Sequence, residues 1–433
     1  EMKRLLREKI PAWFLCTIFF GLAIHAPLTV WVGTHWPDYA LFVKAWKEVL
    51  LLIVLLLVVI DVTLRRQWQR WLSDRIIQLA LAFALWHGVV ALLVPTSGLA
   101  LLSGLLIDLR FVALGVTVYV FVSNYPQYRR WLLRMLGAGA VIVIGFAAAQ
   151  LVLPRDVLVP LGYGPTTIEP YQTVDSNSAY VRINSTLRGP NPLGAYASTV
   201  LTLIVAYSAL QWRRISHMRR WVLGGMALLA ALAVWQSYSR SALLAVAVGV
   251  GIVAIVRAWR SQASRRIVLW GAGAILGCGV IVGSIGYARD PHFIDNVILH
   301  NDPTHGPTQT SDSDRITSLQ AGLARALQQP LGTGVGSTGS ASLLGNGQSL
   351  IIENHYLFVA HEIGWIGLLL LVALTTGVLV KLWHRRSYWL AFGSFAGGIG
   401  LTVIGLFLPV FVDDTVSMLW WGLAALAITE DGL

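Results

Sequence analysis

Long apolar runs recur from Trp13 to Ile428, and they constrain the fold of this chain more than any other feature. Each run is about twenty residues long, which is enough to cross a bilayer as an α-helix. Only 12% of the residues are charged, and the mean hydropathy is +0.67. A water-soluble chain would be richer in charge. The sequence therefore predicts an all-α polytopic membrane protein, with residues 1–433 forming a single transmembrane helical domain.

The apolar runs divide the chain into about twelve predicted membrane spans. They cover residues 13–32, 44–62, 75–94, 98–122, 131–153, 192–211, 220–237, 241–257, 266–286, 358–382, 388–409 and 412–428. Basic residues crowd into alternate connections. The N-terminal segment and residues 64–75, 123–134, 211–220, 257–266 and 381–388 together hold 22 of the 32 Lys and Arg residues. Because cytoplasmic loops carry such an excess, we expect both termini inside.

The net charge of +11 follows largely from this topology. Basic loops on the inner side also suit contact with anionic membrane lipids. The charge therefore gives no reason to expect a nucleic-acid partner.

The same topology exports two polar insertions, residues 155–190 and residues 287–355. Within the second, Asp312 or Ser313 can cap a helix that runs to about Gln328. Such a helix would place apolar residues along one face, namely Ile316, Leu319, Leu323 and Leu327. We expect this face to pack on the membrane bundle or to lie along the interface, because it needs an apolar partner. The second insertion is thus predicted to be a long, partly helical loop.

Six arginines fall on the outer side, where short translocated segments normally lack Lys and Arg. They are Arg182, Arg188, Arg240, Arg289, Arg315 and Arg325. Guanidinium groups bind phosphate oxygens through two parallel hydrogen bonds. The pattern predicts an anionic ligand on the outer face.

Other motifs have simpler explanations. Residues 334–339 match the letters G-x-G-x-x-G, but a helix precedes them, whereas a dinucleotide site needs a preceding strand, so we interpret them as a turn. Asp312 and Asp314 resemble the D-x-D pair of metal-dependent transferases. Two carboxylates at a helix start also complement the helix dipole, and this second explanation is favoured. The histidines show no ligand spacing, so no metal is expected.

Charged residues also occur inside the predicted spans, where charge is costly and usually paired or functional. Asp108 and Arg110 lie near the middle of the fourth span, and residues two apart on a helix point to different sides. We expect them not to pair with each other, and Arg110 to serve either a ligand or an interhelical ion pair. For His87 we expect a hydrogen bond between helices.

Three stretches occur in one order in this topology. The first is residues 182–194, RINSTLRGPNPLG, which leads into a span. The second is residues 237–242, SYSRSA, a very short outer turn. The third combines residues 313–315 (SDR), 330–336 (PLGTGVG) and 353–367, which begin Glu353-Asn354-His355 and contain Gly364 and Gly367.

Together these stretches resemble the O-antigen ligase and polymerase superfamily. That family carries an R…N-P-N-x-x-G segment, an S-R-[S/G] turn, a periplasmic loop with an Arg-bearing helix and G-V-G, and a closing H-[NSQ]-x9-G-x-x-G motif. The present sequence departs from the pattern at two places. The triplet reads Pro190-Asn191-Pro192, and the family's His falls at Glu353, with His355 two positions later.

The resemblance implies a glycosyltransferase of the bacterial inner membrane whose active site faces the periplasm. Its donor would be a glycan linked to undecaprenyl pyrophosphate, and its acceptor would be lipid A–core oligosaccharide. Glu353 or His355 would act as general base, and the register favours Glu353. The pyrophosphate would be bound by Arg182, Arg188, Arg240 and Arg315, with Arg110, Arg289, Asn191 and Asn354 as further candidates. Because arginines would neutralise the leaving group, no metal or cofactor is expected, and direct attack would invert the anomeric centre.

Alternatives remain open at this point. A polymerase and a protein O-oligosaccharyltransferase share the donor chemistry, and we favour an O-antigen ligase because the sequence carries no appended soluble C-terminal domain. A lipid or solute transporter is the alternative from another class. The dozen spans and the deep charges of Asp108 and Arg110 favour it, whereas the lack of visible repeats opposes it.

Overall fold

The computed structural model of the chain describes residues 2–174, 177–259, 288, 311–345 and 350–429. It confirms the expected class, an all-α polytopic membrane protein. Among these residues, eight helices are long and apolar enough to cross a membrane, and two shorter apolar helices accompany them. The predicted span at 266–286 and the candidate Arg289 lie outside the described residues.

Helices occupy all the other predicted spans. Their bounds are α2 (Ile10–Gly21) with α3 (His25–His35), α5 (Trp46–Leu64), α7 (Arg75–Leu93), α8 (Gly98–Asn124), α9 (Arg129–Ala149), α10 (Pro190–Gln211), α11 (His217–Gln236), α12 (Arg240–Ala258), α16 (His355–His384), α17 (Trp389–Ile404) and α18 (Asp414–Ile428). Short helices are α1 (Met2–Arg4), α4 (Ala40–Lys44) and α6 (Trp68–Leu72). A π-helical turn covers Leu5–Lys9, and 3-10 turns cover Leu22–Ile24, Pro37–Tyr39, Pro126–Tyr128, Val159–Leu161 and Trp212–Arg214.

Several helices begin where a polar side chain satisfies their first amides. Asp74 accepts a hydrogen bond of 2.8 Å from the Ile76 amide at the start of α7. Asp413 accepts one of 3.0 Å from the Val416 amide at the start of α18. Such caps fix the helix starts, because the first four amides of a helix have no partner within it.

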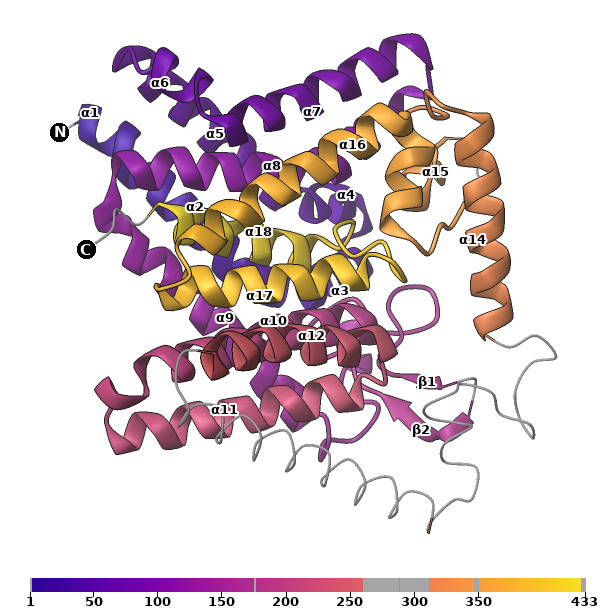
Figure 1. Ribbon diagram of the computed structural model, residues 1–433. Coiled ribbons are helices and arrows are strands. Elements are labelled where there is room, and N and C mark those ends of the chain that lie inside the picture. The colour runs from indigo at the N-terminus through magenta and orange to yellow at the C-terminus, as the bar shows by residue number, and fades with distance from the viewer. Residues whose placement is uncertain (1, 175–176, 260–287, 289–310, 346–349, 430–433) are drawn as a thin grey trace.

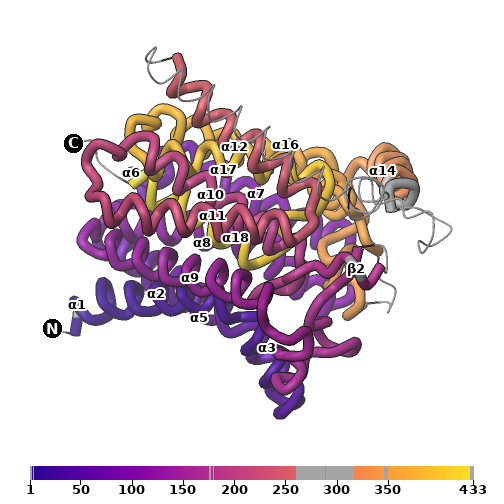
Figure 2. Tube along the Cα trace, turned by 90° about the horizontal axis from the view of Figure 1, so that it is seen from below, coloured from indigo at the N-terminus to yellow at the C-terminus, as the bar shows by residue number. Residues whose placement is uncertain are grey.

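The membrane helices run side by side along one axis (Figure 1). One end, which we call the basic end, carries α1, α6 and the short connections at 125–128, 212–216 and 385–388. The opposite end, which we call the insertion end, carries residues 150–189 and 311–354. Figure 2 shows the same separation from a second direction, with α1 far from α14 and β2. The alternation of basic and polar connections along the sequence therefore corresponds to two ends of the bundle.

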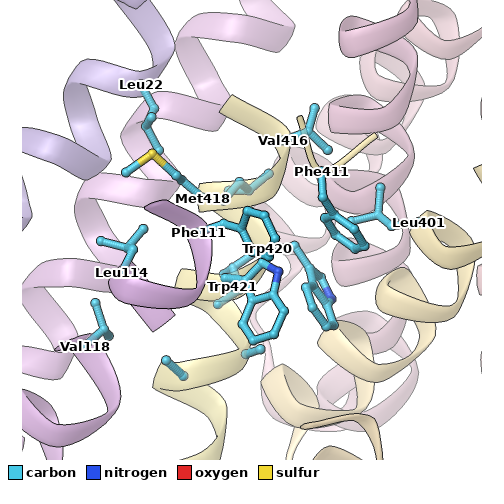
Figure 3. Packing of buried hydrophobic residues seen from close by; sticks show 14 of the residues in the cluster. Leu22, Phe111, Leu114, Val118, Leu401, Phe411, Val416, Met418, Trp420 and Trp421 are labelled. Atoms are coloured by element: carbon cyan, nitrogen blue, oxygen red, sulfur yellow. The ribbon is translucent and has the colours of Figure 1, made fainter. Parts of the chain in front are cut away.

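Helix α18 lies within the bundle, and every one of its residues is buried. Trp420 is fully buried and donates a hydrogen bond of 2.9 Å from Nε1 to the Ser394 carbonyl of α17. The rings of Phe111 and Phe411 stack beside it with centroids 5.8 Å apart (Figure 3). Close packing of this kind holds membrane helices together, since lipid is as apolar as the side chains themselves.

Glycines on α17 permit this close packing. A Cβ atom at Gly398 would lie 2.5 Å from the Trp420 ring, and one at Gly400 would lie 3.0 Å from the Ala245 carbonyl of α12. Larger residues at these positions would push the helices apart. The α17 helix can therefore contact α10 and α12 on one side and α18 on another.

The first insertion contains an antiparallel hairpin that the sequence analysis did not anticipate. Strand β1 (Gln172–Val174) pairs with β2 (Asn177–Arg182), and Gln172 lies opposite Arg182. The hairpin is a small addition to a helical fold. Its second strand ends at Arg182.

The second insertion contains the predicted helix, α14 (Ser311–Gln328), followed by the short α15 (Gly339–Ser342). Of the two expected positions of its leucine face, packing on the bundle is wrong, and lying along the membrane interface stays a prediction. Leu323 and Leu327 are 48% and 64% exposed. Instead, a different face carrying Gly322 and Ala326 packs against α16, where a Cβ at Gly322 would lie 3.2 Å from Leu357. The small residues allow the two helices to approach, and the larger leucines point elsewhere.

Candidate functional site

The first two sequence motifs contact each other at the insertion end. The Arg182 guanidinium donates from Nε to the Ser237 carbonyl at 2.9 Å and from Nη2 to Asn191 Oδ1 at 2.7 Å. The Ile183 amide also donates to the Gln236 carbonyl at 3.2 Å. The end of β2, the start of α10 and the α11–α12 turn therefore meet around one arginine. Asn191, a weaker candidate from sequence, orients Arg182.

The α11–α12 turn packs closely against α10. A Cβ at Gly194 in α10 would lie 2.7 Å from Ala242 and 2.8 Å from Ser237 Oγ. Tyr238 adopts a left-handed conformation with φ of 48°, which few non-glycine residues tolerate. The turn therefore ends at once, and Arg240 becomes the first residue of α12. This geometry brings Arg240 close in sequence and space to the atoms that bind Arg182.

Arg188 belongs to a second cluster, which centres on Asp414 at the start of α18. Its Nη2 lies 3.2 Å from Asp414 Oδ2 and 3.2 Å from His25 Nε2. The side chain is 44% exposed, whereas the Asp414 side chain is fully buried. Attraction by Asp414 raises the pKa of the Arg188 guanidinium. Asp414 thus holds a charged arginine whose side chain stays partly exposed.

The cluster continues into the bundle through Lys47, whose Nζ lies 2.9 Å from Asp414 Oδ2 and 3.1 Å from Glu48 Oε1. Glu48 in turn contacts Arg110 Nη1 at 3.1 Å. We call His25, Lys47, Glu48, Arg110, Arg188 and Asp414 the Asp414 network. Burying charge in a membrane bundle is expensive, so such networks are usually paired and functional.

Arg110 makes the interhelical ion pair that was one of its two expected roles. It is 8% exposed, pairs with Glu48 on another helix and donates to the Val412 carbonyl. A role of Arg110 toward a ligand stays a prediction. Asp108 and Arg110 do face different partners, as the spacing predicted.

Sequence reasoning missed four members of this network, namely His25, Lys47, Glu48 and Asp414. A signal was present, because Lys47-Glu48 and Asp413-Asp414 are charged pairs at the starts of apolar runs. Only the fold brings them within contact of Arg188.

Two of the three parts of the third motif, residues 330–336 and 353–367, contact each other. The Thr333 amide donates to the His361 carbonyl at 2.7 Å, and the Gly334 amide donates to the Glu362 carbonyl at 3.1 Å. Gly364 interrupts α16 with φ of 70°, and a Cβ there would lie 2.2 Å from the Pro330 carbonyl. The glycines of both segments thus permit a close approach of two backbones. The G-x-G-x-x-G letters form a packed turn, since the structure places no strand before them.

Asn354 and His355 lie where α16 begins. Asn354 accepts from the Leu357 amide at 2.9 Å and donates to the Leu406 carbonyl at 2.9 Å, so it caps the helix and joins it to the end of α17. His355 is 2% exposed and packs against Phe358 and Phe411. Glu353 precedes the cap and is half-buried. Of the two candidate bases, Glu353 is the more accessible to a substrate.

Residues 405–414 connect the separate clusters. The Gly405 carbonyl accepts from the His355 amide at 2.8 Å, and the Leu406 carbonyl accepts from Asn354. Asp414 at the other end of this segment holds Arg188. The segment therefore contacts both the closing motif and the Asp414 network. Arg315 lies in the first turn of α14.

Two further residues singled out from the sequence are His87 and Arg325. His87 bonds through Nδ1 to the Phe83 carbonyl of its own helix at 2.8 Å, so the expected bond between helices is not made by this nitrogen. Arg325 is half-buried near the end of α14.

Residues 225–372 match the family model described as O-antigen ligase. The matched segment contains the SYSR turn, α14 and the closing Asn354, Gly364 and Gly367 pattern, and it confirms the resemblance to O-antigen ligase-type members of the superfamily. Arg182, Arg188 and the Asp414 network's remaining members lie outside it. No curated protein matches the chain.

Proposed function

We propose that this protein is an O-antigen ligase, which transfers a glycan from undecaprenyl pyrophosphate to lipid A–core oligosaccharide at the periplasmic face of the bacterial inner membrane. The family match supports an O-antigen ligase/polymerase-type glycosyltransferase. The observation that carries the finer proposal is the anchoring of arginines at one end of the bundle. Arg182 is oriented by the turn that leads to Arg240, and Arg188 is held by Asp414 while 44% of its side chain stays exposed.

Anchored arginines suit a pyrophosphate leaving group. As the bond from the sugar C1 to the pyrophosphate oxygen breaks, negative charge grows on the phosphates. Preorganised cations stabilise that charge without reorganising during the step, and losing one such donor typically costs about 10²–10³-fold in rate. Arg182, Arg188, Arg240 and Arg315 are the proposed cations. Pyrophosphate is already a good leaving group, so the proposal assigns no general acid and no metal.

The acceptor hydroxyl supplies the new bond. Its O–H bond breaks, the proton passes to Glu353, and the oxygen attacks C1 from the side opposite the pyrophosphate. This direct displacement inverts the anomeric centre. Glu353 is proposed as the base because it is half-buried beside the start of α16, whereas the His355 ring lies deeper among aromatic side chains.

The test is transfer by purified protein in lipid nanodiscs, with lipid-linked glycan as donor and no ion gradient. We expect product with lipid A–core. Arg182→Ala and Arg188→Ala should each lower the rate by about 10²-fold or more, and Arg188→Lys should also be impaired because an ammonium cannot copy the guanidinium fork. Arg130→Ala, at an exposed arginine of the basic end, is the matched control and should retain the rate.

The acceptor decides among the alternatives. Product only with a second lipid-linked glycan would identify a polymerase, and product only with a protein hydroxyl would identify a protein O-oligosaccharyltransferase. Wild-type rates in Arg188→Ala would refute the anion site. No product with any acceptor, together with gradient-dependent movement of lipid or solute, would favour the transporter.

A further inference from the structure

Three titratable side chains outside the proposed donor site gather around a small buried cavity. They are His87 on α7, Asp108 on α8 and Glu362 on α16, and His355 joins them from the first turn of α16. All four are at least nine-tenths buried, with exposed fractions of 0%, 9%, 1% and 2% in that order. The cavity has room for about one water molecule. Its remaining lining is apolar and includes Phe83, Phe111, Val359 and Phe411.

Glu362 is held from the turn at residues 334–338. One carboxylate oxygen accepts from the Thr338 amide at 3.0 Å and from the Thr338 hydroxyl at 2.5 Å. The other accepts from the Gly336 amide at 3.1 Å. Its position is therefore fixed by three donors, none of which is charged.

The carboxyl groups of Asp108 and Glu362 line the same small cavity, one from α8 and the other from α16. Ionised carboxylates only accept hydrogen bonds, so a bond between two of them requires a proton on one. Two adjacent carboxylates in a buried site also resist ionising together. Within the described residues, neither makes an ion pair with Lys or Arg. Two buried carboxyl groups at one cavity, without a Lys or Arg partner among the described residues, favour a pair that shares one proton.

Three histidine ring nitrogens at the cavity make no hydrogen bond among the described residues. His87 donates from Nδ1 to the Phe83 carbonyl, so its Nε2 is the free acceptor of the neutral ring, and this atom lies 3.7 Å from Asp108 Oδ2. Neither ring nitrogen of His355 makes a hydrogen bond among the described residues. A buried water needs two to four polar partners, and these atoms provide them.

Among the described residues, no Lys or Arg lines the cavity. Arg110 is on the same helix as Asp108, but its guanidinium is directed to Glu48 and the Val412 carbonyl. The turn at 334–338 contributes only backbone amides and a hydroxyl. The segment at 411–412 contributes Phe411 and Val412.

We propose that Asp108, Glu362, His87 and His355 form an internal proton site, in which the carboxyl pair shares one proton and one water links it to His355. The second half of the inference rests on the proposed function. His355 is two residues from Glu353, so the site can accept the proton that Glu353 takes from the acceptor hydroxyl. One proton moves in this step. It converts the carboxyl pair from a monoanion to a neutral pair. The pyrophosphate leaves with the electrons of the C1–O bond. Asp108 is then a positioning and proton-holding residue that touches no substrate.

Infrared difference spectroscopy of the full chain in nanodiscs tests the site without using glycan transfer. We expect a protonated-carboxyl band that Asp108→Asn and Glu362→Gln each remove. Asp74→Asn is the matched control, since Asp74 is paired with Lys381 at 2.7 Å at the basic end and carries no shared proton. Asp108→Asn is the decisive variant, because Glu362 also holds the 334–338 turn and its replacement can unfold the protein. A wild-type band that survives Asp108→Asn in folded protein overturns the proton site.

The transfer assay tests proton uptake. Asp108→Asn should slow transfer at least about tenfold at pH 7, the lower end of what acid–base groups contribute, while donor binding stays unchanged. Raising the pH or adding imidazole should restore much of the rate, because a base in solution then removes the proton. A loss of rate that neither treatment restores indicates a purely structural role and overturns the uptake step. The infrared test does not depend on the assignment of the glycan reaction, so the two proposals can fail separately.

Discussion

At the scale of single residues, Glu353 and His355 differ in surroundings more than in sequence position. The cap formed by Asn354 separates them, because it ends the loop on one side and starts α16 on the other. Glu353 stays on the loop, half-buried, whereas His355 turns inward against Phe411. One helix start therefore gives the two candidate bases different surroundings.

The first prediction follows from that difference. Glu353→Gln should lower the transfer rate by at least about tenfold, and up to 10⁴-fold, because the acceptor hydroxyl loses its base. Donor binding, measured with labelled lipid-linked glycan, should persist, because the arginines are untouched. His355→Ala should cause the smaller loss of the two. The opposite ranking would move the base to His355.

At the scale of elements, the interruption of α16 at Gly364 lets residues 330–336 dock on the helix. The Trp365 amide donates to the Pro330 carbonyl at 3.0 Å, and the Trp365 ring donates to the Ala326 carbonyl of α14 at 3.0 Å. Because α16 is interrupted at Gly364, the Trp365 amide donates to a carbonyl of the loop and not to one within the helix. The kink joins α14, the 330–336 segment and α16 into one unit.

The second prediction tests this unit through two glycines. Gly364→Ala should lower the stability by about 1–3 kcal/mol, because alanine resists a φ of 70° and its Cβ would collide with the Pro330 carbonyl. Gly224→Ala in α11 is the control, since a Cβ there meets nothing within 4 Å. Thermal unfolding in detergent should show a clear drop in Tm for the first variant and little change for the second. Equal behaviour of both variants would show that the kink does not hold the loop.

At the scale of the whole molecule, the two ends of the bundle differ in chemistry. The basic end carries short arginine-rich connections, and the insertion end carries the hairpin, α14 and the anchored arginines (Figure 1). The positive-inside rule assigns the basic end to the cytoplasm.

The third prediction concerns this orientation. In a variant without Cys16 and Cys278, a cysteine at Thr166 should react with an impermeant maleimide applied from the periplasmic side, and a cysteine at Gln69 should react only after the membrane is opened. Both positions are exposed, Thr166 in the first insertion and Gln69 within α6. The reverse labelling pattern would place the proposed active site in the cytoplasm, where the lipid A–core acceptor of this proposal is not presented.

The sequence by itself determined the membrane class and the positions of the helices. These depend on local properties: length of apolar runs, caps such as Asp74, and the few residues able to form tight turns. The α14 helix was equally predictable, since a cap and a 3.6-residue period are local signals. The hairpin before Arg182 was not, because its strands are three and six residues long.

Only the tertiary structure decided which face of α14 packs and which charges meet. The leucines of α14 formed the more hydrophobic face, yet Gly322 and Ala326 contact α16, because close approach depends on the shape of the partner as well as on apolarity. Asp414 contacts Arg188, which is 226 positions away in the chain, and Asp108 lines one cavity with Glu362 of another helix. Contacts between such distant residues are fixed by how whole helices pack, and no local pattern encodes them.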